Sequence, residues 1–234
     1  MYFFDAFSAE ELAVNDKPFI IKGGLKNPEC YITWADVENC MNNPALYELK
    51  DVGPFDDYYE PYYTYKNTWL IRHVIDKRRL FGSINNGNTL CIENYGYYNY
   101  QINTLLKEFE TRFNVVCAAH VYCGLKGSRS FSTHSDVPAN FILQISGNTP
   151  WKVFKQRSTG LLDITTSNNF AKLKNFTGED IELEAVLTPG DVLYIPSRQY
   201  HVALPNEPRI SISVPCAHRG NMQVYDRNYY KLEI

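Results

Sequence analysis

The stretch HSDVPANFILQISGNTPWKVF, residues 134–154, sets two ligand-type residues in front of a long apolar run. His134 and Asp136 stand two apart, so in an extended chain their side chains project from the same face. A pair of this kind also has a simple structural explanation, because a His and an Asp two apart can hydrogen-bond each other at a sheet edge. A metal site therefore requires a third ligand elsewhere in the chain.

That third ligand is predicted in TPGDVLYIPSRQYHVAL, residues 188–204. Pro189 and Gly190 predict a turn, 191–195 a strand that Pro196 ends, and His201 opens the next strand. Two imidazoles and one carboxylate on one face are the donor set of non-haem Fe(II) oxygenases, which leaves positions for an oxidant and a co-substrate. We therefore expect the metal ligands, which are also the catalytic residues, to be His134, Asp136 and His201.

The second half of the chain has the pattern of a β-rich core. Short apolar, aromatic and β-branched runs alternate with turns, which is typical of a sandwich, barrel or jelly roll. These runs are VVCAAHVYC (115–123), NFILQISG (140–147), WKVFK (151–155), ELEAVL (182–187), DVLYIP (191–196), YHVAL (200–204) and RISISV (209–214). The pattern favours a mainly β fold with flanking helices.

The first 114 residues mix helical patterns, a strand and turns. The expected elements are a helix beginning at Ser8, a strand in 17–25, a helix capped by Thr33, an ordered Tyr-rich loop at 51–67 and an amphipathic helix at 100–114. The loop is either a flap packed on the body or a lid over the substrate. We expect a single domain over 1–234, in which 1–114 packs on a core at 115–216 and 217–234 forms a tail.

The chain has 234 residues, which is long enough for one substantial core. Its net charge of −3 gives no electrostatic sign of nucleic-acid binding. The short basic cluster at 77–79 is interpreted as a solvated face. No apolar run approaches the roughly 20 residues that span a bilayer, and the N-terminal stretch lacks the pattern of a signal peptide. Six scattered Cys without a C-x-x-C pair suit reduced, buried thiols. These features predict an intracellular, cytoplasmic protein without membrane or nucleic-acid partners.

Taken together, H-x-D at 134–136, Q-x-x-G at 144–147 and G-D-x-L-Y-I-P-x-x-x-x-H at 190–201 resemble the JmjC and cupin-like Fe(II)/2-oxoglutarate oxygenases. The resemblance is to their hydroxylase branch and covers most of the chain. It implies a double-stranded β-helix, Fe(II) and 2-oxoglutarate as cofactors, and hydroxylation of a protein or peptide side chain or of a small molecule.

The resemblance also suggests residues for 2-oxoglutarate. Asn140 matches a position from which some members reach its metal-proximal end, although a structural hydrogen bond is the alternative. Many members hold the distal carboxylate with Lys or Arg fifteen residues after the first His, where this chain has Thr149. A hydroxyl does not replace that charge.

Arg209 with Ser211 is the best substitute, because it resembles the R-x-S pair that other branches use for the same carboxylate, and a guanidinium binds carboxylates in a bidentate manner. The alternative for Arg209 is a surface position at the start of a strand. Lys152 is a weaker candidate, since it lies on the opposite strand face from Thr149. Tyr122 either lines the site or belongs to the core.

Thr149 keeps two other functions open. One is a metal-binding cupin that serves as a binding or scaffold protein without 2-oxoglutarate turnover, and the other is a 2-oxoglutarate-independent metal enzyme. The C-terminal stretch 223–234 either packs on the body or mediates a homodimer.

Overall fold

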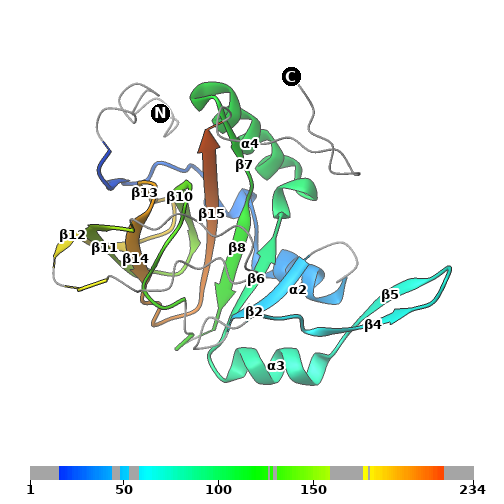
Figure 1. Cartoon of the computed structure of the whole chain (residues 1–234). Coiled ribbons are helices and arrows are strands. Elements are labelled where there is room, and N and C mark those ends of the chain that lie inside the picture. The colour runs from blue at the N-terminus through cyan, green and yellow to red at the C-terminus, as the bar shows by residue number, and fades with distance from the viewer. Residues whose placement is uncertain are drawn as a thin grey trace.

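The structure, a computed structural model, describes residues 16–43, 48–52, 58–125, 127–128, 131–158, 176–178 and 180–218. The helix expected at Ser8 and the stretch 223–234 lie outside these residues. The elements are β1 (Phe19–Ile21), η2 (Pro28–Cys30), α2 (Trp34–Asn42), β2 (Glu48–Val52), β3 (Tyr58–Tyr59), β4 (Tyr62–Lys66), β5 (Ile71–Ile75), α3 (Lys77–Asn85), β6 (Thr89–Glu93), η3 (Tyr95–Tyr97), α4 (Tyr100–Phe113), β7 (Val115–Cys117), β8 (His120–Gly124), β9 (His134–Ser135), β10 (Ala139–Ser146), β11 (Thr149–Arg157), β12 (Ile181–Leu187), β13 (Val192–Ile195), β14 (Gln199–Ala203) and β15 (Arg209–His218) (Figure 1).

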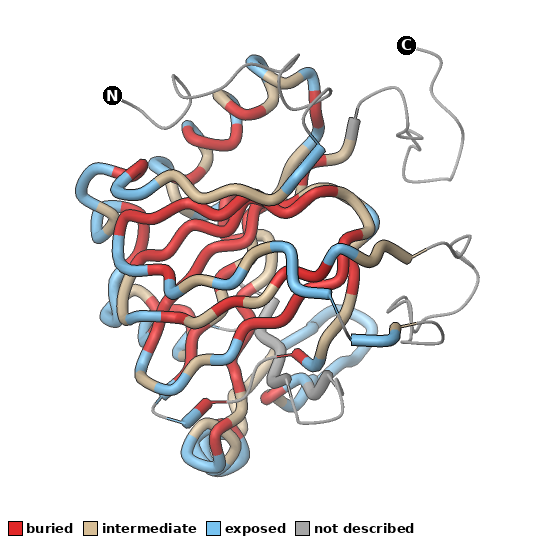
Figure 2. The backbone as a smooth tube through the Cα atoms, turned by 90° about the vertical axis from the view of Figure 1, so that its left-hand side faces the viewer, coloured by how far each residue is buried: buried red, intermediate tan, exposed pale blue. Residues whose placement is uncertain are grey.

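Two sheets form the body of the described fold. The larger has the order β1-β13-β10-β15-β8-β6-β2-β3, with β7 also paired to β15, and the smaller has the order β12-β11-β14-β9. Ile142 and Leu193 of the larger sheet belong to the same buried cluster as Trp151 and Val153 of the smaller one. The sheets therefore pack face to face, and Figure 2 shows buried residues through the stacked strands of the body. This architecture confirms the expected mainly β fold of the double-stranded β-helix type.

The position of β10 between two packed layers explains why its sequence is almost continuously apolar. Phe141 and Leu143 face the layer that contains α4, and the Phe141 ring lies 4.9 Å from that of Phe109. Ile142, one position out of phase, faces the smaller sheet instead. A strand covered on both faces requires apolar residues at nearly every position. Asn140 and Gln144, on the same face as Ile142, are the polar exceptions, and both are fully buried.

Strand β15 alternates strictly. Ile210, Ile212 and Val214 pack into the large core cluster that includes α4. The intervening residues Arg209, Ser211 and Ser213 are buried on the opposite face, toward the interior of the roll. The alternation of the RISISV run therefore separates a packing face from a polar interior face.

The helices at 34–42 and 100–113 confirm two sequence predictions. Thr33 caps α2 in a reciprocal arrangement with Asp36, whose carboxylate accepts from the backbone of Thr33. The expected apolar face of α4 is buried through Ile102, Leu105, Leu106 and Phe109. None of the described helices combines the length and apolarity needed to cross a membrane.

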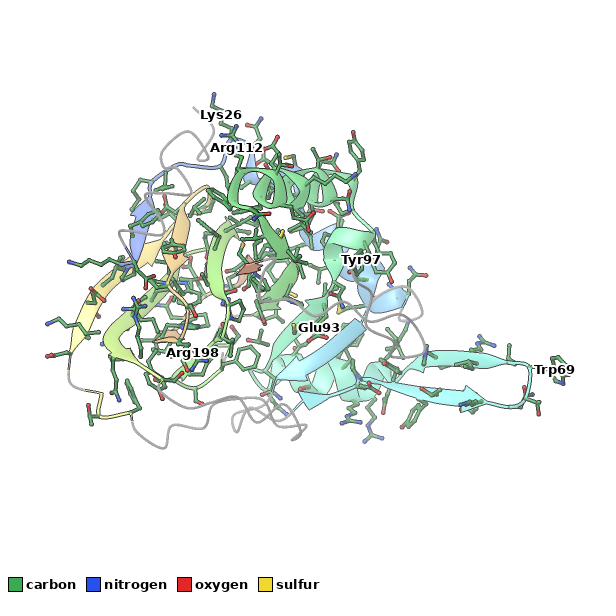
Figure 3. All side chains as sticks on the ribbon, turned by 45° about the horizontal axis from the view of Figure 1, so that its top comes forward. Lys26, Trp69, Glu93, Tyr97, Arg112 and Arg198 are labelled. Atoms are coloured by element: carbon green, nitrogen blue, oxygen red, sulfur yellow. The ribbon has the colours of Figure 1, made fainter. Side chains whose placement is uncertain are left out.

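The prediction of an irregular loop at 51–67 is wrong where the structure describes the stretch. Residues 62–66 form β4, which pairs with β5 as a hairpin that projects from the body with Trp69 near its tip (Figure 3). The YYTYK run is rich in the aromatic and β-branched residues that favour a strand, but the adjacent Pro61 indicates a break in regular structure. Helix α3, capped by the Asp76 side chain, was not predicted, because Leu80 alone among its residues is buried. The 115–123 run also divides into β7 and β8.

Candidate active site

His134, Asp136 and His201 converge at one point. Their ligand atoms all lie within 4.8 Å of one another. His134 on β9 and His201 on β14 are directly opposite each other in an antiparallel pair, so their ring centroids lie 4.4 Å apart. Asp136 directly follows β9, with its Oδ1 3.8 Å from His134 Nε2 and its Oδ2 3.6 Å from His201 Nε2. The pairing of two short strands thus brings together groups 65 positions apart in sequence.

The same local contact orients both imidazoles. Nδ1 of His134 lies 2.8 Å from the carbonyl oxygen of Ser132, and Nδ1 of His201 lies 2.8 Å from that of Gln199. A carbonyl only accepts, so each Nδ1 carries the proton and each Nε2 presents a lone pair to the site. Burial lowers the pKa of His201 to about 4, with a further contribution from the neighbouring His134. His201 is therefore neutral near pH 7, as a metal ligand must be.

Asp136 is held by side-chain and backbone contacts. Asn140 donates to its Oδ2 at 2.6 Å, and the Asn140 oxygen accepts from Ser213 at 3.2 Å. The carbonyl of Asp136 accepts the backbone N–H of Arg198 at 2.7 Å, which joins the β9–β10 and β13–β14 connections. Asn140 is hydrogen-bonded to the carboxylate and is not among the residues that line the pocket. In this structure it makes the structural hydrogen bond considered as the alternative to a 2-oxoglutarate contact.

A pocket beside the triad contains a buried cation. Its lining residues are Tyr122, Phe131, His134, Asp136, Ile142, Trp151, His201, Ala203, Arg209, Ser211 and Ser213. Arg209 is only 1% exposed, which excludes the surface position considered from the sequence. Burial lowers its pKa to about 10, a value that still leaves the guanidinium charged near neutral pH. A buried cation suits an anionic ligand, since desolvation of a charge is costly without compensation.

A chain of hydrogen bonds orients Arg209. Its Nη1 donates to Ser211 Oγ at 3.3 Å, and that hydroxyl donates to Gln144 Oε1 at 2.9 Å. Gln144 Nε2 donates to the carbonyls of Ser146 and Gly147 at 3.0 and 2.9 Å, which fixes the direction of the amide. Gln144 and Ser213 were not identified as site residues from sequence. For Gln144, the sequence feature that could have indicated a site residue is a polar side chain within the otherwise apolar run of β10.

The remaining sequence candidates have different positions. Tyr122 lines the pocket, lies directly opposite Ser211 in the β8–β15 pair, and packs its ring edge-on against Phe131 at 5.6 Å. Thr149 is fully buried, outside the pocket lining, and its hydroxyl has no hydrogen-bond partner among the described residues. Lys152 is not brought to the pocket, because Trp151 and Val153 take the inward positions of β11. Its Nζ instead lies 3.3 Å from Glu184 on β12.

A double-stranded β-helix with two imidazoles and a carboxylate on its inner strands defines a cupin-type protein with a facial metal-binding donor set. The model of the JmjC domain family matches residues 96–224, more than half of the chain. The chain therefore belongs to the JmjC domain family.

Two curated relatives are 33% identical to this chain. One is the bifunctional lysine-specific demethylase and histidyl-hydroxylase NO66 of Aedes aegypti, aligned over 132 residues, or 55% of this chain and 19% of the relative. The other is human ribosomal oxygenase 1, aligned over 115 residues, or 49% of this chain and 17% of the relative. The similarity thus spans less than a fifth of each relative.

Solved structures of YcfD from Escherichia coli share the fold. One superposes with a TM-score of 0.62 at 13% identity and covers 95% of this chain and 54% of that protein. A second, described as a ribosomal oxygenase in complex with cobalt and 2-oxoglutarate, has a TM-score of 0.55 at 15% identity and covers 86% of this chain and 48% of that protein.

Proposed function

We propose that this chain is an Fe(II)- and 2-oxoglutarate-dependent oxygenase that hydroxylates its substrate. The observation that carries the proposal is the position of Arg209 and Ser211 in the same pocket as His134, Asp136 and His201. The triad supplies the donors for a metal, and the buried guanidinium supplies a counter-charge for a dicarboxylate. Membership of the JmjC domain family, and the YcfD complex with cobalt and 2-oxoglutarate, support a metal and 2-oxoglutarate as the ligands of such a fold.

The donor set fits a divalent metal on chemical grounds. Each imidazole offers Nε2 because its Nδ1 is hydrogen-bonded to a carbonyl, and Asp136 brings the negative charge. Bound iron would supply the activation of O2, of which one atom would go to 2-oxoglutarate as it is decarboxylated to succinate and CO2 and the other to a substrate C–H bond. Arg209 and Ser211 would bind the distal carboxylate, while Tyr122, Phe131 and Trp151 would limit access of water.

The proposed substrate class is a protein side chain. The relatives' names, histidyl-hydroxylase and ribosomal oxygenase, indicate a protein target and a ribosomal setting for those proteins. Because the similarity spans less than a fifth of each, the proposal for this chain stops at a protein or peptide substrate. A metal-binding cupin without 2-oxoglutarate turnover is the second candidate, and the neutral Thr149 at the usual cation position favours it.

Anaerobic titration of 2-oxoglutarate into the Fe(II)-loaded protein tests the proposal. Chelation by the co-substrate produces a weak visible metal-to-ligand charge-transfer band, which we expect for the unmutated protein and not for Asp136→Ala. Circular dichroism of Asp136→Ala serves as the control for its fold. Absence of the band with iron demonstrably bound would reject the oxygenase and leave the metal-binding cupin.

A matched pair of cation variants tests the co-substrate site. Arg209→Met removes the buried guanidinium, and we expect it to weaken 2-oxoglutarate binding by about 2–5 kcal/mol, the usual loss for a buried charge pair. Lys152→Met removes a cation from the outer side of the same roll and should leave the affinity unchanged, since Lys152 pairs with Glu184. Equal affinities for both variants would contradict the assignment of Arg209.

A further inference from the structure

The hairpin arm, defined as residues 62–79, comprises β4, β5 and the start of α3 and has the opposite charge from the chain as a whole. It contains five Lys and Arg residues and one carboxylate, whereas the whole chain has a net charge of −3. These cations are Lys66, Arg72, Lys77, Arg78 and Arg79, and all five are exposed. The low overall charge that argued against a polyanionic partner thus conceals a basic segment that runs from the hairpin into the start of α3.

Large apolar and aromatic side chains are exposed on the same arm. Trp69 is 95% exposed, and Tyr63 and Tyr65 are 58% and 62% exposed. Leu70 and Ile71 extend the apolar tip. Figure 3 shows Trp69 at the far end of the hairpin, well apart from Lys26 and Tyr97 on the body.

The strand register places two tyrosine rings and the Arg72 guanidinium on one face of the hairpin. Tyr63 and Tyr65 are two apart on β4 and so project from the same side, and Arg72 lies directly opposite Tyr65. The Tyr63 hydroxyl donates to Asp76 Oδ2 at 2.8 Å, and Asp76 Oδ1 accepts the backbone N–H of Arg79 at 3.0 Å. The base of the hairpin is thereby linked to the N-terminus of α3, next to Lys77 and Arg78.

We propose that the hairpin arm binds single-stranded nucleic acid, with Trp69, Tyr65 and Tyr63 as stacking surfaces and the flanking Lys and Arg residues as phosphate contacts. Aromatic rings interleaved with cations are the combination that single-strand-binding proteins use without sequence preference. An apolar tip backed by cations also suits insertion into an anionic membrane. The tyrosine rings aligned behind the tip beside Arg72 favour nucleic acid, because bases stack along such a row.

Fluorescence anisotropy of end-labelled rU12 and dT12 with the full chain tests this proposal. We expect saturable binding that weakens as the salt concentration rises from 50 to 200 mM. Trp69→Ala and Arg72→Glu should each weaken binding about ten-fold or more. The two oligonucleotides distinguish RNA from DNA. Tryptophan emission should be quenched on binding, as expected for a ring stacked on a base, and the quenched part should be the part missing from Trp69→Ala, since Trp34 and Trp151 also emit.

Matched controls use an exposed ring and an exposed cation elsewhere. Tyr97→Ala and Lys26→Glu lie off the arm and should bind as the unmutated protein does. Asp136→Ala should also retain binding, so this proposal stands or falls independently of the oxygenase site. Failure to bind either oligonucleotide, or equal losses in the control variants, would overturn it. Two other results would also overturn the proposal. One is a blue shift of tryptophan emission with anionic phosphatidylserine vesicles but no response to either oligonucleotide. The other is a protein that binds neither oligonucleotide and forms a dimer that Trp69→Ala abolishes.

Discussion

Gln144 is fully buried in the middle of β10, and both ends of its amide are occupied. Because its nitrogen donates to two backbone carbonyls, its oxygen is the end that faces Ser211. The Ser211 hydroxyl must then donate to Gln144, which leaves the hydroxyl oxygen to accept from Arg209. Gln144 therefore positions Arg209 without contacting the pocket itself.

Replacement of this residue tests its positioning role. Gln144→Leu has a similar volume but offers no acceptor, so we expect 2-oxoglutarate affinity to fall by about 1 kcal/mol, the net value of one hydrogen bond. The iron affinity should not change, because the triad makes no contact with Gln144 in the described hydrogen bonds. Isothermal titration with each ligand separates the two effects. Parallel losses of metal and co-substrate affinity would indicate a general disturbance of the roll instead.

For single residues, the sequence alone predicts those that lie in short motifs. The spacing of His134, Asp136 and His201 is readable along the chain, and the structure brings the three residues together. The Gln144–Ser211 contact joins residues 67 positions apart, and it depends on the β10–β15 register. Sequence periodicity does not reveal which strands are neighbours, so this contact was not predictable from one chain.

At the scale of elements, Asp191 connects the β12–β13 turn to β1. Its carboxylate accepts from Lys22 Nζ at 2.8 Å, the Gly23 N–H at 3.0 Å and the Thr188 N–H at 2.8 Å. Burial raises the pKa of Asp191, but the hydrogen bonds from Lys22, Thr188 and Gly23 outweigh it, so the pKa lies below its ordinary value. Lys22 is largely exposed, so solvent screening reduces its share of the stabilisation.

Asp191→Asn should therefore lower the free energy of unfolding by about 1–3 kcal/mol at pH 7. A carboxylate whose pKa is lower in the folded state than in the unfolded state stabilises the fold. This stabilisation is fully present above the unfolded-state pKa of about 3.9 and is lost as the pH falls through the folded-state pKa. The difference between the two proteins should consequently shrink below pH 4. Urea denaturation at a series of pH values measures it, and a difference that stays constant down to pH 3 would contradict this role of the charge.

Elements with strong periodicity were predicted well, and exposed elements were not. The buried faces of α4 and β10 leave clear apolar patterns. The β4–β5 hairpin and α3 bury little, so their sequences are not constrained by a core and resemble a loop and a solvated charge run. The way in which the β4–β5 hairpin joins α3 is therefore the part of the described fold that the sequence predicts least.

For the molecule as a whole, metal binding should stabilise the folded state by mass action. Co(II) at a hundred times its dissociation constant would contribute about 2.7 kcal/mol, which corresponds to a rise in Tm of roughly 5–10 °C for a domain of this size. Asp136→Ala should lose this rise. Asp180→Ala, an exposed carboxylate that pairs with Lys155, should retain it. Differential scanning fluorimetry provides the measurement, and an equal rise in both variants would point to binding elsewhere.

The three ligands of the triad are unequally shielded. The side chain of His201 is 3% exposed, that of His134 15% and that of Asp136 33%. The two imidazoles sit on paired strands, whereas the carboxylate follows the end of a two-residue strand. Of the three residues that would hold a metal, Asp136 would therefore be the one most open to a chelator in solution. The two imidazoles, fixed opposite each other on paired strands, would form the protected side of the site.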